Sequence, residues 1–344
     1  MTTSAIRSQT AERIHFSQVA SDALCAERRR AEAGEIAESS VEIFAGRLKN
    51  YILPFFSKID PREINLRNIN EFVSDLQSKS LKGSSIRLIL TSLRRVLFHA
   101  YLMGVVESIP LMPRIRSDST PRGGFTPREY LHLWQEARRQ SAALGLLGPE
   151  WPGSPSKLQF FSKNYPVPES MPYLIRFMVN SFIRPTDLRW IRHRHIQICR
   201  GRHTYLRLDL PTSKRHSTQI ISMRPAVGIY ESILEKSRQS GHDRQEDFLF
   251  LPEIQNRKTA MVLLDLYFRR ILESCELRVG KRGQNRTLYS LRHTAITFRL
   301  LFGRGIDLLT LARNARTSVE MIERFYAFEL SAEMNVDLLH SRRR

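Results

Sequence analysis

One stretch of the chain has no helical or strand pattern, and it separates two regions that can each fold as a domain. The segment "ESIPLMPRIRSDSTPRGGFTPREY" has four prolines and two adjacent glycines, and it shows neither helical nor strand periodicity. Proline removes a backbone donor and glycine favours turns, so such a segment is typical of a linker. We predict a linker at about 104–125 and a domain boundary near residue 117. The 344 residues are enough for two domains of moderate size.

The region before the linker is patterned as helices. From residue 38 to residue 116, apolar residues recur three and four positions apart, which is the spacing of one helix face. The predicted core positions are Val41, Phe44, Leu48, Tyr51, Ile52, Ile69, Phe72, Val73, Leu76, Ile86, Ile89, Leu90, Leu93 and Leu97. This pattern predicts a small all-helical domain. Residues 1–37 include the helical pattern "CAERRRAEAGEIA" and are too few for a domain, so we expect a lead helix or arm there.

The region after the linker is predicted to be a second, mainly helical domain with a small β-sheet. Thr126 and Glu129 have the spacing of a capping box, so a helix should begin between them. Further on, Leu206, Leu208 and Leu210 alternate with polar residues, and a polar loop and then "IISM" follow. This pattern predicts two strands joined by a loop that carries Lys214. The predicted fold class is therefore α+β, mainly α.

The charge of the chain points to a polyanionic partner. The formal net charge is +20, from 54 Lys and Arg against 34 Asp and Glu, and it is spread along the sequence. A basic surface of this kind neutralises phosphates, which favours a nucleic acid as the partner. The alternatives are a merely solvated basic surface, a ribosomal-type RNA-binding protein and a protein that binds anionic membranes.

Cysteine usage and hydropathy indicate a cytoplasmic protein, which would be associated with the nucleoid when bound if the polyanionic partner is DNA. The cysteines, Cys25, Cys199 and Cys275, are an odd number without metal-ligand spacing. No apolar run reaches the length of a membrane span, and the first residues lack the hydrophobic block of a signal peptide.

The segment "IRHRHIQICRGRH" invites a metal hypothesis that its spacing does not support. It contains His193, His195, Cys199 and His203, and these spacings match no closed zinc site. Alternating basic residues on a strand that faces DNA explain the segment equally well. We therefore predict no metal.

The stretch "LYSLRHTAITFRL" places an arginine where an anion could bind. Leu291, Ala295 and Phe298 share one helical face, and Ser290 can cap the helix. Arg292 would then lie in the first turn, where free backbone amides and the helix dipole favour an anion. An arginine at the edge of a buried helix is also a common structural ion-pair partner. The surrounding motifs decide between this role and the binding of an anion.

Two further motifs contain polar residues next to predicted helices. In "FMVNSFIRPTDLRW", Arg184 follows an apolar helix and precedes a proline turn, and Asp187 can orient or pair with it. In "ARTSVEMIERFYAF", Thr317 and Glu320 have capping-box spacing for a helix that ends near Tyr326.

Together these residues resemble the tyrosine recombinase family, the phage-type integrases. "RPTDLRW" is similar to the family's first-arginine box, "YSLRHT" to its second, and "TSVEMIERFY" to the segment with its nucleophile. The resemblance runs from about residue 38 to the helix of Tyr326. It implies a C-shaped clamp of two domains, with a SAM-like core-binding domain at 38–116, a catalytic domain at 117–330 and a tail at 331–344.

The resemblance implies specific roles and no cofactor. Tyr326 would attack the scissile phosphate and form a 3′-phosphotyrosyl link. Arg184 and Arg292 would bind the non-bridging oxygens, and Lys214, with Arg215 as the alternative, would protonate the leaving 5′ oxygen. Guanidinium groups suit this task because they are always charged and donate in pairs. The covalent link conserves the bond energy, so the family needs neither ATP nor an obligatory metal.

Two positions depart from the family's pattern. Tyr289 stands where the second-arginine box usually has histidine, and Thr317 stands where histidine or tryptophan often precedes the nucleophile. A tyrosine can hydrogen-bond a phosphate oxygen but is a poorer base than imidazole at neutral pH. His293 lies about 100° around the helix from Arg292, so we expect a structural role for it. We expect Thr317 to be a helix cap, with at most a hydroxyl contact to phosphate.

The implied partners are specific sites on double-stranded DNA and further copies of the chain. The family exchanges strands as a tetramer on two sites, in some cases with an accessory DNA-bending protein. The tail has Val336, Leu338 and Leu339 as apolar contacts, and it either docks on a neighbouring protomer or packs on its own. Two alternatives remain for the function: a binding-only regulator of the same fold, and an enzyme like a type IB topoisomerase that relaxes supercoils.

Overall fold

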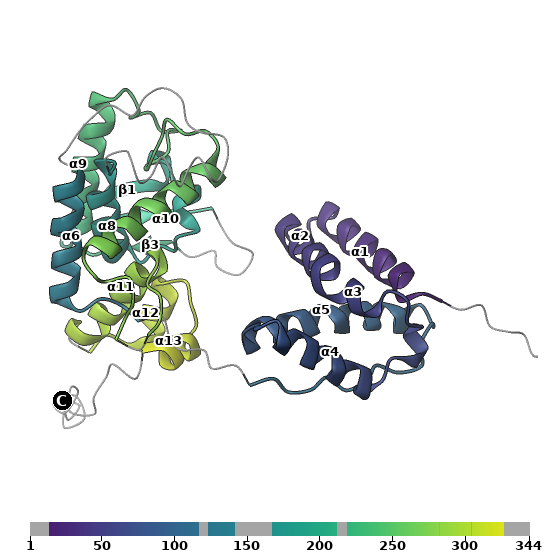
Figure 1. Cartoon of the computed structure of the whole chain (residues 1–344). Coiled ribbons are helices and arrows are strands. Elements are labelled where there is room, and N and C mark those ends of the chain that lie inside the picture. Colours follow the sequence, from purple (N-terminus) through teal and green to yellow (C-terminus); the bar gives the residue numbers. More distant parts are fainter. Residues whose placement is uncertain are drawn as a thin grey trace, which may run out of the picture. The chain divides into compact units, whose positions relative to one another are not determined.

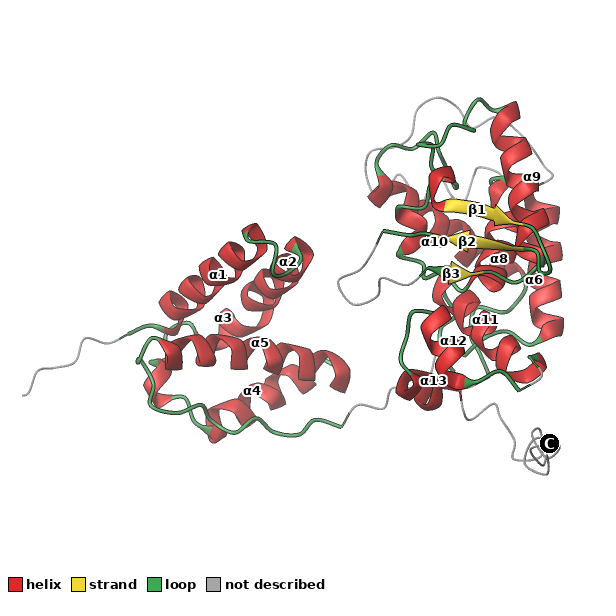
Figure 2. Ribbon diagram, turned by 180° about the vertical axis from the view of Figure 1, so that it is seen from behind, coloured by secondary structure: helices red, strands yellow, loops and turns green. Residues whose placement is uncertain are grey.

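The chain is mostly helical, with a small three-stranded antiparallel sheet (Figures 1 and 2). The computed structural model describes residues 14–116, 123–141, 167–211, 219–281, 283–303 and 305–326. The chain divides into two compact units, which are Met1–Ser119 and Thr120–Arg344. We call them unit 1 and unit 2. The α+β fold class that the sequence predicts is confirmed.

Unit 1 is helical throughout its regular elements. They are α1 (Phe16–Glu32), α2 (Glu38–Arg47), a π-helical turn (Leu48–Ile52), α3 (Leu53–Phe56), a 3-10 turn (Pro61–Glu63), α4 (Leu66–Ser78) and α5 (Gly83–Leu102). Helix α4 begins at Leu66 because the Asn65 side chain accepts hydrogen bonds from the amides of Arg67 and Asn68. All the predicted core positions of this region are buried except Tyr51, which is partly buried.

The lead helix is part of unit 1 and not a separate arm. Phe16, Val19, Ala20 and Ala23 of α1 are buried in the same core as α2 to α5. The rings of Phe16 and Phe56 lie 5.6 Å apart. The apolar face of the lead helix expected within residues 1–37 is therefore buried against the other helices of unit 1. Residues 1–13 lie outside the described ranges.

In the sequence of unit 2, helices both precede and follow the three strands. Its elements are α6 (Pro127–Ser141), α8 (Ser170–Ser181), 3-10 turns at Asp187–Arg189 and His193–His195, β1 (Ile196–Cys199), β2 (Tyr205–Leu208), β3 (Ile220–Ile221), α9 (Pro225–Gln239), α10 (Arg257–Ser274), α11 (Leu288–Phe302), α12 (Leu308–Asn314) and α13 (Val319–Tyr326). The predicted start of α6 is confirmed, since Glu129 accepts from the Thr126 amide at 2.8 Å.

The sheet has the order β1-β2-β3, and both pairs are antiparallel. Leu208 is opposite Ile196 on one side and Ile220 on the other. Leu206 and Leu208 of β2 are buried, as their alternation predicts, because successive strand residues point to opposite faces. The two predicted strands are therefore β2 and β3. Lys214 belongs to the connection between them and lies outside the described residues.

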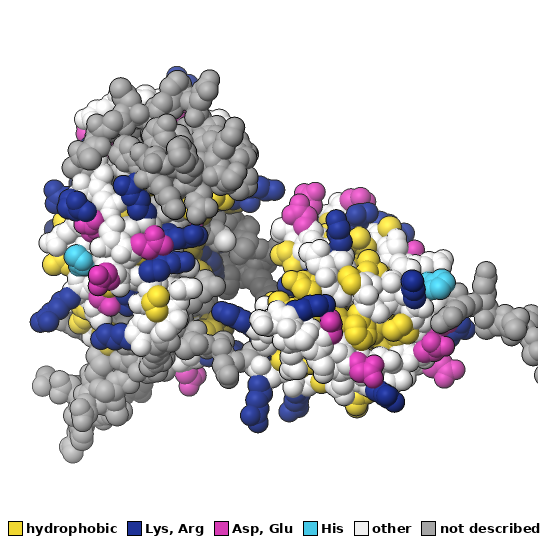
Figure 3. Space-filling model, in the orientation of Figure 1, with side chains coloured by type: hydrophobic (Ala, Val, Ile, Leu, Met, Phe, Trp, Pro, Cys, Tyr) yellow, Lys and Arg dark blue, Asp and Glu magenta, His cyan; other side chains and the backbone are white. Residues whose placement is uncertain are grey.

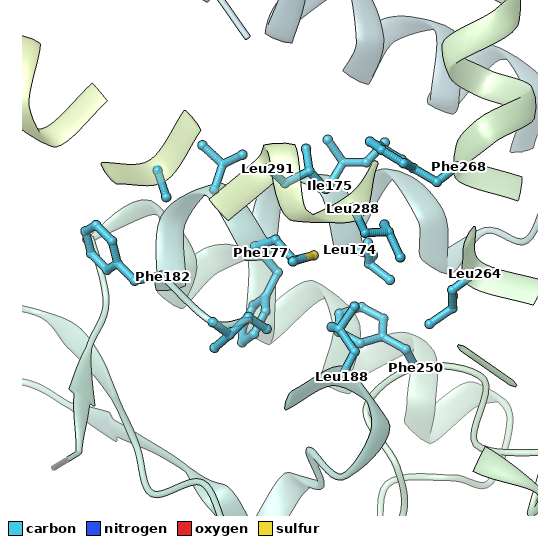
Figure 4. Close-up of a cluster of buried hydrophobic side chains, with 14 of the residues drawn as sticks. Leu174, Ile175, Phe177, Phe182, Leu188, Phe250, Leu264, Phe268, Leu288 and Leu291 are labelled. Carbon is cyan, nitrogen blue, oxygen red and sulfur yellow. The ribbon is translucent and has the colours of Figure 1, made fainter. Parts of the chain in front are cut away.

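Helix α8 is central to the core of unit 2. Leu174, Ile175 and Phe177 of α8 are fully buried, together with Leu288 and Leu291 of α11 (Figure 4). Burying a side chain of this size stabilises a fold by about 1.5–3 kcal/mol relative to exposure. Helix α8 and the first turn of α11 are consequently held against each other.

Basic side chains are distributed over both units. On the face seen in Figure 3, Lys and Arg side chains alternate with acidic and apolar ones and do not gather in one patch. Among the described helices, none is both long and apolar enough to span a membrane.

Candidate active site

Arg184 leaves the core directly after α8. The helix ends at Ser181, the next residue, Phe182, has a left-handed φ of 58°, and Ile183 is fully buried. The Arg184 amide donates to Oδ2 of Asp187 at 2.7 Å, so Asp187 orients Arg184 through the main chain. The half-buried guanidinium of Arg184 donates through Nη2 to the carbonyl oxygen of Arg316.

Arg292 lies one turn deeper in its helix than the sequence suggested. Thr287 and not Ser290 is the N-cap of α11: the Thr287 hydroxyl accepts from the Tyr289 amide, while the Ser290 hydroxyl accepts from the Thr287 amide, both at 3.3 Å. This reciprocal pair satisfies the free amides of the first turn, so the helix starts at Leu288. The expectation that Arg292 lies in the first turn, where the helix N-terminus would help to bind an anion, is therefore wrong.

The Arg292 guanidinium is instead held by backbone oxygens. It is 2% exposed, and it donates through Nη1 to the carbonyl of Phe182 and through Nη2 to the carbonyl of Ala315. Burial lowers the pKa of Arg292, and the neighbouring charge of Arg184 lowers it further. Both shifts oppose the charged form, so a bound anion would be favoured beside these two arginines.

Tyr326 is the last residue of α13 and faces the same place. It is 5% exposed. Burial raises the pKa of the Tyr326 phenol above its ordinary value, and the positive charge of Arg292 acts in the opposite direction. The Tyr326 ring also contacts that of His293, the residue that follows Arg292. The phenol is thus held neutral next to a cation that stabilises its ionised form.

Three rings form a row beside Arg292. The ring centroids of Tyr289 and His293 are 5.0 Å apart, and those of His293 and Tyr326 are 5.1 Å apart. His293 is 6% exposed, so it packs between the two tyrosines. Sequence reasoning gave His293 a bracing role and did not foresee its contact with Tyr326.

Thr317 does not cap α13. The cap is Ser318, whose hydroxyl accepts from the Met321 amide at 3.2 Å. Thr317 instead closes α12, because its amide donates to the Ala312 carbonyl at 2.9 Å. Ser318 lies immediately before the first helical residue, where the unsatisfied amides are within reach of its hydroxyl. Thr317 is half-buried in the turn that supplies the carbonyls for Arg184 and Arg292.

The histidine-rich segment forms no metal centre in the described part of the chain. His193 is buried with Nδ1 3.2 Å from the hydroxyl of Tyr230, and His195 Nδ1 accepts from the Arg192 amide at 3.0 Å. Across the described ranges, no group of three His, Cys, Asp or Glu residues is placed to hold an ion. The expected basic strand is also wrong: His193–His195 is a 3-10 turn, and β1 carries no basic residue.

Sequence reasoning missed Arg316. This residue is 2% exposed, and its Nη1 lies 3.8 Å from Oδ1 of Asp187. Its only signal in the sequence is its place directly before Thr317. The structure therefore brings Arg184, Asp187, Arg292 and Arg316 together beside Tyr326, whereas Lys214 lies outside the described residues.

Comparisons with known proteins show the fold. Neither a protein-family model nor a curated protein matches the chain. Solved structures do match, and a lambda integrase dimer bound to a COC′ core site has a TM-score of 0.60 at 15% identity, covering 89% of this chain and 94% of that chain. The Tn1549 transposon integrase in complex with circular intermediate DNA has a TM-score of 0.59 at 13% identity, covering 95% and 100%.

A lambda integrase tetramer bound to a Holliday junction matches with a TM-score of 0.61 at 15% identity, covering 89% of this chain and 78% of that chain. All three alignments extend over both units of the chain. The chain therefore has the fold of the tyrosine-recombinase integrases, as its three sequence motifs predicted.

Proposed function

We propose that the protein is a site-specific DNA recombinase of the tyrosine class, which cuts and rejoins DNA strands. The Tyr326 oxygen attacks the scissile phosphorus and loses its proton, and the bond from phosphorus to the 5′ oxygen breaks. Arg184 and Arg292 bind the non-bridging oxygens, and Lys214 gives its proton to the leaving 5′ oxygen. The product is a 3′-phosphotyrosyl link, which a 5′ hydroxyl reverses.

One observation carries this proposal: Arg184, Arg292 and Tyr326 come from three separate segments and meet at one buried place. An in-line displacement accumulates charge on the equatorial oxygens of the phosphate, and paired guanidinium donors stabilise that charge. A tyrosine beside these donors supplies the nucleophile. A purely structural cluster would not require a buried phenol next to two arginines.

The fold neighbours support DNA as the substrate. They include a dimer bound to a COC′ core site and a tetramer bound to a Holliday junction. By analogy, unit 1 acts as a core-binding domain, unit 2 as the catalytic domain, and four protomers synapse two sites. The tail at 331–344 docks on a neighbouring protomer in this assembly. It lies outside the described residues.

The experiment that tests the function is a search for a covalent adduct. Purified protein is incubated with DNA from both sides of its own gene, and samples are run on native and denaturing gels. We expect a shifted band on the first gel and a denaturant-resistant adduct on the second. Binding without an adduct would favour a binding-only regulator, and relaxation of any supercoiled plasmid would favour a topoisomerase.

Lys214→Ala should slow adduct formation by about 10²–10⁴-fold, because general acid catalysis contributes this much. A DNA substrate with sulfur in place of the leaving 5′ oxygen should restore the rate, since a thiolate leaves without a proton. The measurement is the single-turnover rate on both substrates. Arg215→Ala is the matched control. If the sulfur substrate rescues only that variant, Arg215 and not Lys214 is the general acid.

The adduct rate should rise with pH from 6 to 9, by up to tenfold per unit. The raised pKa of Tyr326 means that the ionised fraction is small throughout this range and grows with each unit. Lysine stays protonated over the same range. Single-turnover rates in a buffer series measure this slope. A rate that does not change with pH over this range would contradict this prediction.

DNA affinity should fall steeply with salt. A protein that neutralises six to ten phosphates loses about 10³–10⁵ in affinity between 50 and 200 mM salt. Because the net charge is +20, we expect a loss in affinity at or above the lower end of this range. Titrations followed by fluorescence anisotropy measure it. A change of less than tenfold would contradict a binding mode in which phosphate contacts supply most of the affinity.

A further inference from the structure

Arg316 occupies a backbone position that favours glycine. Its φ is 52°, its amide donates to the Arg313 carbonyl at 3.0 Å, and the Thr317 amide donates to the Ala312 carbonyl at 2.9 Å. These two bonds form the helix-ending motif whose left-handed residue is usually glycine. Any other residue there is strained, so the arginine side chain should contribute something that glycine lacks.

The main chain of this turn holds both phosphate-binding arginines. The carbonyl of Ala315 accepts from Nη2 of Arg292, and the next carbonyl, that of Arg316, accepts from Nη2 of Arg184. Because the two acceptors are consecutive, one turn fixes the spacing of the two guanidinium groups. A small rotation of the turn would move both at once.

The Arg316 side chain ties the same turn to the Arg184 segment. Its Nη1 lies 3.8 Å from Oδ1 of Asp187, and Oδ2 of Asp187 accepts from the Arg184 amide at 2.7 Å. The contacts therefore close a ring: Arg184 side chain to Arg316 backbone, Arg316 side chain to Asp187, and Asp187 to Arg184 backbone.

The ion pair in this ring is buried. The side chains of Arg316 and Asp187 are 2% and 12% exposed, and in the described part of the chain Arg316 Nε has no hydrogen-bond partner. Solvent screens such a pair weakly, and loss of either partner leaves the other charge buried and uncompensated. The pair is consequently sensitive to substitution on either side.

We propose that Arg316 is a positioning residue, whose ion pair with Asp187 fixes the turn that sets Arg184 and Arg292 for one phosphate. This inference rests on the proposed function and deepens it. Arg316 acts through the two arginines and does not itself touch the DNA.

Arg316→Gly tests the side chain alone, because glycine is the favoured residue at this backbone position and the variant should fold. In the full-length protein we expect the single-turnover adduct rate to fall by 100-fold or more, with DNA affinity within threefold of wild type. Arg316→Lys, which restores a charge, should recover at least a tenth of the wild-type rate. Asp187→Asn combined with Arg316→Gly should be no slower than Arg316→Gly.

Arg286→Met is the matched control. Arg286 is also buried and pairs with Glu129 in unit 2 at 3.0 Å, but it holds neither of the two arginines. It should lower the melting temperature and leave the rate within severalfold of wild type. An Arg316→Gly rate within threefold of wild type, or equal losses in both variants, would overturn the inference.

A second measurement separates this inference from the proposed function. Inorganic phosphate is titrated into the wild-type and Arg316→Gly proteins by calorimetry, without DNA. We expect binding to wild type and at least tenfold weaker binding to the variant, even if no DNA gives an adduct. Equal affinities, or no binding to wild type, would overturn the positioning role itself.

Discussion

Tyr326→Phe should bind DNA as wild type does and form no covalent adduct. Phenylalanine keeps the ring that packs against His293 and lacks the attacking oxygen. Losing a nucleophile of this kind lowers a rate by at least about 10⁴-fold. The free energy of unfolding of the variant should be within about 1 kcal/mol of the wild-type value, because one hydroxyl is removed and the packing is retained. Native and denaturing gels measure binding and adduct on the same samples.

Tyr230→Phe is the matched control for this prediction. Tyr230 is likewise 5% exposed in unit 2, and its hydroxyl lies near His193 and away from the arginines. This variant should retain the adduct. An adduct that persists in Tyr326→Phe would assign the nucleophile to another residue and contradict the account.

Arg292→Lys should lower both the adduct rate and the free energy of unfolding. Lysine keeps the charge but cannot donate to the carbonyls of Phe182 and Ala315 with a planar fork. Removing one such donor from a reacting phosphate costs about 10²–10³-fold in rate. The two lost hydrogen bonds from a buried charge should cost about 3 kcal/mol in stability. Single-turnover rates and urea unfolding measure the two effects.

The two effects can be separated with Arg257→Lys. Arg257 is 4% exposed and donates to the carbonyls of Arg189, Phe250, Leu251 and Ile254, none of which accepts from Arg184 or Arg292. We expect a similar loss of stability and an unchanged rate per folded molecule. Equal rate losses in both variants would mean that Arg292 acts only through stability.

Periodic elements of the fold were predictable from the sequence. The apolar positions of α5 and the alternation of β2 follow directly from the repeats of helix and strand, which local chain geometry dictates. The linker was predicted from the absence of both repeats, which its prolines and glycines exclude.

Helix ends were less predictable than helix cores. Ser290 and Thr287 are three residues apart and both have capping side chains, so spacing alone does not say which is the cap. The same ambiguity made Thr317 a candidate in place of Ser318. In both cases the cap is the residue just before the first helical one, and packing of the helix decides where that is.

The contacts that build the site needed the tertiary structure. Arg184, Arg292 and Tyr326 could be named from motifs, but the carbonyls that hold the arginines belong to residues 182, 315 and 316, which no side-chain pattern marks. Arg316 was missed for a related reason: arginine is an unusual residue for a left-handed helix end, so the residue type did not mark this turn.

The central claim is tested most directly by locating the covalent bond. The wild-type adduct is digested with nuclease and protease, and the peptides are analysed by mass spectrometry. The account predicts a nucleotide joined by its 3′ phosphate to Tyr326, with a free 5′ hydroxyl on the other DNA strand end. A nucleotide on any other residue, or a 5′-phosphate linkage, would contradict it.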